Sequence, residues 1–143
     1  MKNKGFTLIE LLAVIVILAI IALIATPTIL GVVENARQGA AESSVLGFVD
    51  AVEKQSMINE MDADTENDFS DANLTIPQLT GDKYKVSVKG QVPSEVGSTS
   101  STSTTGTVSI VNGEVQTQYF KLGKYTIKYD ATTGKASAVT GNN

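Results

Sequence analysis

Apolar residues are concentrated near the start of the chain. An uninterrupted apolar run extends from Leu11 to Ala25, and it reaches back to Phe6 with only Thr7 and Glu10 as polar interruptions. At about 1.5 Å per residue, a helix over residues 6–26 has a length of about 32 Å, close to the ~30 Å of bilayer hydrocarbon. The pattern therefore predicts an apolar helix over residues 6–26 that can span a membrane.

A second helical stretch is predicted over residues 27–61. Pro27 removes the donor to the carbonyl of Leu23, and Gly31 is a further weak helix position, so we expect a kink there and not an end. Beyond the kink, one face carries apolar residues at helical spacing: Val45, Phe48, Val49 and Val52. We expect that face to cover the core of a folded head, in preference to binding a cofactor or a partner helix.

From residue 62 onward the pattern changes. Residues 62–73 are acidic and polar, which predicts the loop that leaves the helix. Tyr84, Val86 and Val88 then alternate with polar residues, as a half-buried strand requires. A stretch from Gly97 to Gly106 is rich in Ser and Thr and has no large apolar residue, so it predicts a flexible exposed loop.

Two hairpins are predicted near the C-terminus. Residues 107–111 meet residues 114–122 across Asn112-Gly113, a pair that readily adopts the positive φ angles of a tight turn. Residues 125–129 and 135–139 form the second hairpin. The expected fold class is α+β: a long N-terminal helix, apolar in its first half, packed at its C-terminal half on a small antiparallel sheet of about four strands.

Composition narrows the function. The chain has 143 residues, enough for one small head once the helix is set aside. It contains no Cys and no His, which removes thiol nucleophiles, imidazole bases, the usual transition-metal ligands and disulfides. We therefore expect a protein that is not an enzyme and has no cofactor. The net charge is −4 without a basic run, so direct nucleic acid binding is not expected.

The charges around the apolar run predict an orientation. Lys2 and Lys4 precede the run, whereas the charged residues within the next twenty positions are Glu34, Arg37 and Glu42. Positive charge favours the cytoplasmic side of a membrane. We expect a single pass with the N-terminus in the cytoplasm and the bulk of the chain outside.

Glu10 is the one carboxylate within the apolar segment. An isolated carboxylate costs about 2.5 kcal/mol or more to insert near the centre of a bilayer, and it is tolerated mainly where a partner neutralises it. A position near the interface, with the side chain reaching water, is the alternative. Glu10 is therefore a candidate for a contact made outside the single chain.

Residues 4–10, KGFTLIE, with the apolar run behind them resemble the class III processing and assembly signal of type IV prepilins and type II secretion pseudopilins. The resemblance covers about the first third of the chain, and it is most like short-leader type IVa-like major pilins. In that family a prepilin peptidase cuts after the Gly and methylates the new N-terminal residue. The resemblance thus implies cleavage between Gly5 and Phe6 and N-methylation of Phe6.

The resemblance also implies partners. Glu10 would pair with the α-ammonium of Phe6 in a neighbouring copy inside a helical filament. Before assembly the subunits would be held in the cytoplasmic membrane, and a membrane platform with an ATPase would extract them into an extracellular pilus. The implied parts are a leader over 1–5, a membrane and filament-core helix over 6–26, its kinked continuation over 27–61 and a head over 62–143. The missing Cys is a departure, because many type IV pilins close the head with a disulfide.

Other interpretations of the same segment remain open. A secretory signal peptide shares the lysines and the apolar stretch, but this run is long and no small-x-small pattern precedes Pro27. A permanently anchored surface binding protein explains the length and leaves Glu10 unexplained. Within the resembling family, the alternative is a pseudopilin or minor pilin of a type II secretion or competence system.

The acidic loop invites a calcium interpretation. Asp62, Asp64 and Glu66 alternate as in an EF-hand loop. The match then fails, because Asn67 stands where the motif needs Gly and Asn73 where it needs the closing Glu. We therefore expect a solvated acidic loop and no metal site.

Overall fold

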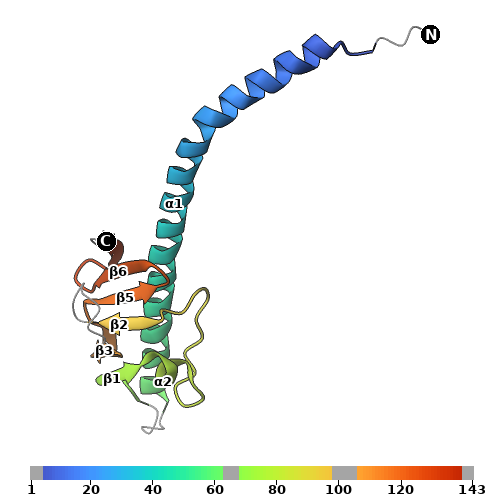
Figure 1. Ribbon diagram of the computed structural model, residues 1–143. Helices are drawn as coiled ribbons and strands as arrows, with labels where there is room; N and C mark the ends of the chain where they lie inside the picture. The colour runs from blue at the N-terminus through green and yellow to red at the C-terminus, as the bar shows by residue number, and fades with distance from the viewer. Residues whose placement is uncertain (1–4, 63–67, 98–105, 140–143) are drawn as a thin grey trace. The chain divides into compact units, whose positions relative to one another are not determined.

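The computed structural model describes residues 5–62, 68–97 and 106–139. The chain divides into two compact units, residues 1–37 and residues 38–143. Helix α1 (Leu8–Met61) contributes to both units, and all strands belong to the second (Figure 1).

The predicted helices over 6–26 and 27–61 form one element, α1, which begins at Leu8 and ends at Met61. The assigned helix continues without interruption through Pro27 and Gly31. Just before the proline, the Thr26 hydroxyl donates a hydrogen bond of 2.7 Å to the carbonyl of Ala22. Such back-bonding is often associated with bent helices. The kink itself stays a prediction.

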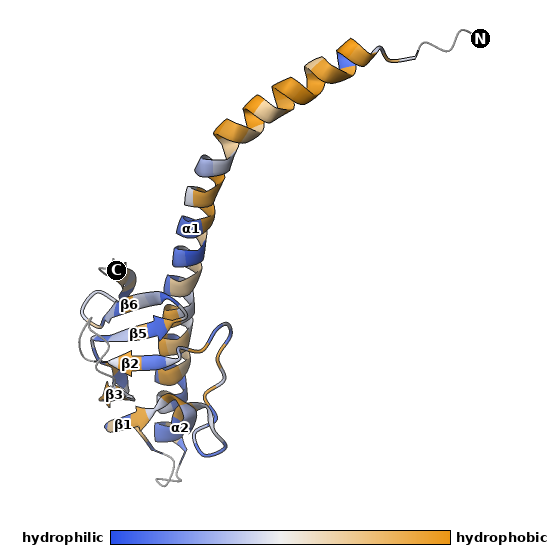
Figure 2. Ribbon diagram, in the orientation of Figure 1, coloured by the Kyte–Doolittle hydropathy of each residue, from blue (hydrophilic) through white to orange (hydrophobic). Residues whose placement is uncertain are grey.

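Over residues 11–25, α1 is apolar on all sides (Figure 2). Its large side chains are uncovered: Ile17 is 57% exposed and Leu23 is 79% exposed. By length and composition, the helix can cross a membrane. A helix that is hydrophobic all round needs a protein or lipid environment to cover it.

The second unit contains two antiparallel sheets where we predicted one. A three-stranded sheet has the order β1-β3-β4, and a four-stranded sheet has the order β2-β5-β6-β7. A short helix, α2, follows β1 directly in the sequence. The bounds are β1 Ala72–Thr75, α2 Ile76–Thr80, β2 Glu95–Gly97, β3 Thr107–Val111, β4 Glu114–Val115, β5 Gln118–Leu122, β6 Tyr125–Asp130 and β7 Lys135–Val139.

Both predicted hairpins are confirmed. Asn112 and Gly113 have φ angles of 51° and 77°, as the tight turn between β3 and β4 requires. Strands β6 and β7 pair from Asp130 opposite Lys135. A further hairpin, not predicted, joins β5 to β6.

The predicted strand over 114–122 is split between the two sheets. Its first part, β4, pairs with β3, and its second part, β5, pairs with β2 and β6. The side-chain oxygen of Gln118 accepts the backbone N–H of Ser109 at 3.3 Å. At the same position the Gln116 N–H bonds the Ser109 carbonyl at 2.9 Å, and beyond this bond the chain passes to the second sheet.

The predicted strand around residues 84–88 was wrong. Lys85 has a φ of 55°, which no extended strand residue adopts. The Val86 N–H bonds the carbonyl of Leu79 at 3.0 Å, so Val86 is buried by a loop that folds back on α2. Val86 is buried between exposed Lys85 and Ser87, which is why the sequence has the alternating pattern of a strand here.

Two loop boundaries also differ from prediction. Within the predicted loop over 62–73, strand β1 begins at Ala72 because residues 72–75 pair with β3. Gly97 ends β2 and is buried, so it belongs to the sheet. Residues 98–105, which make up the rest of the predicted Ser/Thr-rich loop, lie outside the described residues.

The predicted core face of α1 is confirmed. Val45, Phe48 and Val52 are fully buried, and Val49 is 3% exposed. The rings of Phe48 and Phe120 meet edge to face, with centroids 5.7 Å apart. Phe120 lies on the inner face of the four-stranded sheet, so α1 and this sheet form two layers around one core.

Two glutamates of α1 also bind the sheets. Glu42 accepts the backbone N–H of Ala138 in β7 at 2.8 Å, and Glu53 accepts that of Val115 in β4 at 3.0 Å. The N–H groups lie in different sheets. One helix therefore holds both sheets through side-chain contacts as well as through the core.

Candidate functional site

The candidate site is the first turn of α1, where a reciprocal cap begins the helix. The Thr7 backbone N–H and hydroxyl donate to Glu10 Oε2 at 2.8 Å and 2.7 Å. In return, the Glu10 backbone N–H donates to the Thr7 hydroxyl at 3.3 Å. This is a capping box, which satisfies N–H groups that the first turn leaves without helical partners.

The cap fixes where the Glu10 carboxylate lies. It is folded back over the N-terminal end of the helix, beside Thr7. A peptide bond cut between Gly5 and Phe6 would create an amino group one residue before Thr7, hence close to this carboxylate. The helix macrodipole favours a negative charge at the same end. The turn thus gathers the predicted cleavage site and the predicted assembly residue in one place.

Phe6 and the first residues of α1 are open to solvent in the single chain. Phe6 is 88% exposed, Leu8 is 83% exposed and Ile9 is 73% exposed. A Cβ atom added to Gly5 would meet no atom within 4 Å. The fold itself therefore does not require glycine at position 5.

Pro27 and Gly31 lie farther along the helix, in the same unit as the first turn. A Cβ at Gly31 would also meet no atom within 4 Å. An open apolar groove lies beside Pro27, lined by Ile21, Ile24, Ala25, Thr28 and Ile29. Its walls belong to a single helix, so a partner must supply any opposite side.

Our sequence prediction treated Glu10 as a lone acid, either with a partner outside the chain or with its side chain reaching water. The structure adds Thr7 as a partner within the chain. The signal was present in the sequence, because Thr7 and Glu10 have the T-x-x-E spacing of a capping box ahead of an apolar run.

Among the described residues, no group of three or more acidic side chains is arranged to hold a metal ion. Of the acids and amides considered for calcium, Asp64, Glu66 and Asn67 lie outside the described residues. Asn73 is exposed in the middle of β1, paired with Ser109 of β3.

One comparison with known proteins covers the residues of the first turn. Residues 1–26 match the prokaryotic N-terminal methylation motif. No curated protein and no solved structure matches the chain. The motif together with the long apolar helix is consistent with membrane anchoring before assembly into a surface filament, and it points to a structural subunit. The chain therefore carries the class III prepilin signal, and over these residues it is similar to type IV pilins and pseudopilins.

Proposed function

We propose that this chain is the structural subunit of an extracellular type IV pilus. Prepilin peptidase removes residues 1–5, cutting between Gly5 and Phe6, and methylates Phe6. Residues 6–26 then form the filament core, residues 27–61 continue the helix with a kink at Pro27 and Gly31, and residues 62–143 form the exposed head.

The observation that carries the proposal is the coincidence of the methylation motif with an uncovered apolar helix that begins in a capped turn. Gly5 supports it, since nothing in the fold explains a glycine there and recognition by a peptidase does. In the membrane, lipid covers the helix. In the filament, the helices of other copies take the place of lipid.

Glu10 is the residue whose partner changes between the membrane-bound subunit and the filament. In the single chain its carboxylate is bound by neutral donors of Thr7. Between packed apolar helices, a charge needs a charge of opposite sign, because desolvation of an unpaired carboxylate is costly. We propose that the α-ammonium of Phe6 from a neighbouring copy supplies it. In the filament this pairing would join neighbouring copies, so it favours the polymer.

The test is the intact mass of the chain recovered from sheared surface filaments. The proposal expects loss of residues 1–5 and addition of one methyl group on Phe6. Gly5→Leu should leave a chain that starts at Met1 and is retained in the membrane. The matched control is Gly39→Ala, at another glycine with open space around it, which should be processed normally.

Two other outcomes would contradict the proposal. An unprocessed, unmethylated chain at the surface would indicate a permanently anchored protein. A terminus beyond Pro27 would indicate a secretory signal peptide. Electron microscopy of cells with and without the chain then separates a pilus subunit, whose loss removes the filaments, from a pseudopilin or minor pilin, whose loss leaves long filaments in place.

A further inference from the structure

Three large apolar side chains are exposed at the C-terminal end of α1. Met57 is 55% exposed, Ile58 is 57% exposed and Met61 is 88% exposed. Their spacing of one, three and four residues places them on one side of the helix. We call these three residues the helix patch.

The helix patch faces away from the core. Val49, Val52 and Ser56 are buried on the side of α1 that packs on the sheets, whereas Met57 and Met61 point to the other side. Such apolar groups rimmed by polar residues are typical of protein interaction sites.

Acidic residues border this patch. Glu60 and Asp62 are exposed, and neither makes an ion pair with a described residue. The sequence shows the same bias over a longer stretch, since residues 55–82 contain seven acidic residues and no Lys or Arg. Among the described residues, the acids next to the helix patch are therefore Glu60 and Asp62.

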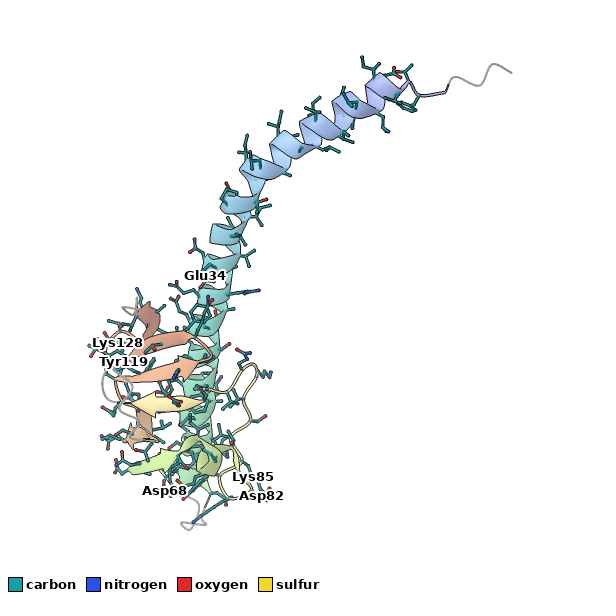
Figure 3. The ribbon with its side chains drawn as sticks, viewed as in Figure 1. Glu34, Asp68, Asp82, Lys85, Tyr119 and Lys128 are labelled. Carbon is teal, nitrogen blue, oxygen red and sulfur yellow. The ribbon has the colours of Figure 1, made fainter. Side chains whose placement is uncertain are left out.

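A second surface lies on the outer face of the four-stranded sheet. Tyr119 and Lys128 are cross-strand partners in β5 and β6, and Figure 3 shows their side chains close together. Asp130 lies two residues after Lys128 in β6, so both side chains are on the same face of the sheet. Lys135 is the cross-strand partner of Asp130 and therefore lies on that face too. We call Tyr119, Lys128 and Lys135 the sheet patch.

The sheet patch has free positive charge. Within the part of the chain that the structure describes, neither Lys128 nor Lys135 makes an ion pair. Two acids share this face. Glu95 is 3.3 Å from Lys121, and Asp130 accepts the N–H of Thr132 at 2.9 Å. The sequence bias here is opposite to that of the helix patch, since residues 115–143 contain four Lys and one acidic residue.

The two patches face opposite sides of the head. Phe120, on the inner face of the sheet, packs on Phe48 of α1, so Tyr119 points away from the helix while Met57 points away from the sheet. Two different patches on opposite sides cannot close a two-fold dimer with each other. A contact between them in successive copies is heterologous, and it generates an open chain of subunits.

We propose that the helix patch of one copy docks on the sheet patch of the next copy. Met57, Ile58 and Met61 would pack against Tyr119, and the bordering acids would meet Lys128 and Lys135. This inference rests on the proposed function, because it assigns the head-to-head contact of the filament. A polyanion is a poorer occupant of the sheet patch, since Glu95 and Asp130 lie on the same face and the helix patch would stay uncovered.

Cysteine cross-linking tests the contact directly, because the full chain has no cysteine of its own. In filaments of the double variant Met61→Cys/Lys128→Cys, oxidation should give a ladder of covalent oligomers. Filaments of each single variant should give no species larger than a dimer. Filaments of the double variant that stay monomeric after oxidation would overturn the inference.

Charge exchange tests the electrostatics. Lys128→Glu/Lys135→Glu should lower the filament yield at least tenfold while the amount of membrane-resident subunit is unchanged. Adding Glu60→Lys/Asp62→Lys in the same chain should restore the yield. The matched control is Lys85→Glu/Lys89→Glu, which changes the charge equally at two exposed lysines outside the sheet patch and should leave the yield unchanged.

The outcomes separate this inference from the proposed function. If the wild-type chain is unprocessed and forms no filament, both are wrong. If processed wild-type filaments form and Lys128→Glu/Lys135→Glu filaments form equally well, only the inference is wrong. Normal filaments that lose binding to duplex DNA would instead identify a polyanion as the occupant of the sheet patch, and would also overturn it.

Discussion

The two halves of α1 differ in what covers them. Over residues 11–25 the helix exposes apolar side chains on every side, and Leu23 is 79% exposed. After residue 38 the same helix buries one face completely, with Val45, Phe48 and Val52 at zero exposure. The head completes its own core, whereas the N-terminal half is left to be covered by lipid or by other chains.

This difference separates folding from assembly. The head contains the aromatic contact of Phe48 with Phe120 and the carboxylates that hold both sheets. The N-terminal half offers an uncovered helix with one capped turn at its start. Changes in the first half should therefore alter the polymer and spare the fold of the head, whereas changes in the core of the head should lower the stability of the head itself.

The largest effect is expected at Glu10. Glu10→Ala removes both the cap and the charge, and we expect at least a tenfold loss of filaments with the subunit still present in the membrane. Glu10→Gln is the matched variant, since Gln also serves in a capping box but has no charge. If pairing with Phe6 drives assembly, Glu10→Gln should fail like Glu10→Ala. Filament counts by electron microscopy decide it, and normal piliation of Glu10→Gln would leave only the cap as the role of Glu10.

The core of the head gives the opposite result. Phe48→Ala removes a fully buried ring and should lower the free energy of unfolding of the head by about 3–5 kcal/mol. Ile17→Ala also deletes apolar atoms, but at a side chain that is 57% exposed in the single subunit, and it should leave head unfolding unchanged. Thermal unfolding of the full chain in detergent, followed by tyrosine absorbance, measures both. Equal destabilisation by the two substitutions would contradict the separation of the halves.

The sequence predicted those features that neighbouring residues determine. The buried face of α1 follows from helical spacing, and the turn at Asn112 and Gly113 follows from the chemistry of that pair. The first turn was predicted as the site, but its cap was overlooked although Thr7 and Glu10 carry the signal.

Features that depend on distant contacts were not predicted. The split of residues 114–122 depends on their pairing with β3 on one side and with β2 and β6 on the other. Lys85 has a positive φ although it is neither glycine nor asparagine, so its residue type does not predict the turn. No sequence motif marks the sheet patch. Tyr119 and Lys128 are separated in the sequence, and only strand pairing brings them together.

Pro27 allows a sharper test of the boundary between the halves. In the single subunit α1 is helical through Pro27 and Gly31. Leu23 lacks its helical donor and Gly31 costs about 1 kcal/mol relative to Ala in a helix, so this is where the helix unwinds most easily. We expect unwound backbone over residues 27–31 in a filament density map. Continuous α-helix from Leu11 through Val45 would falsify this. Pro27→Ala/Gly31→Ala should keep the segment helical and reduce filament yield by a few fold.

The smallest expected effect concerns Glu53 and is confined to the head. The pKa of Glu53 is raised, mainly because the carboxyl is partly buried. The hydrogen bond from the Val115 N–H lowers this pKa, and the negative charges of Glu114 and Asp50 raise it. A carboxyl whose pKa is higher in the folded state than the ordinary 4.5 binds its proton more tightly when folded, so stability falls as the pH rises through this range. Glu53→Gln keeps an oxygen for Val115 and removes the charge. It should raise the midpoint of thermal unfolding at pH 7, and raise it less at pH 4, where more of the wild-type Glu53 carries its proton. Glu60→Gln removes an exposed charge and should show no such dependence on pH, and an equal gain from both variants would indicate a general effect of net charge.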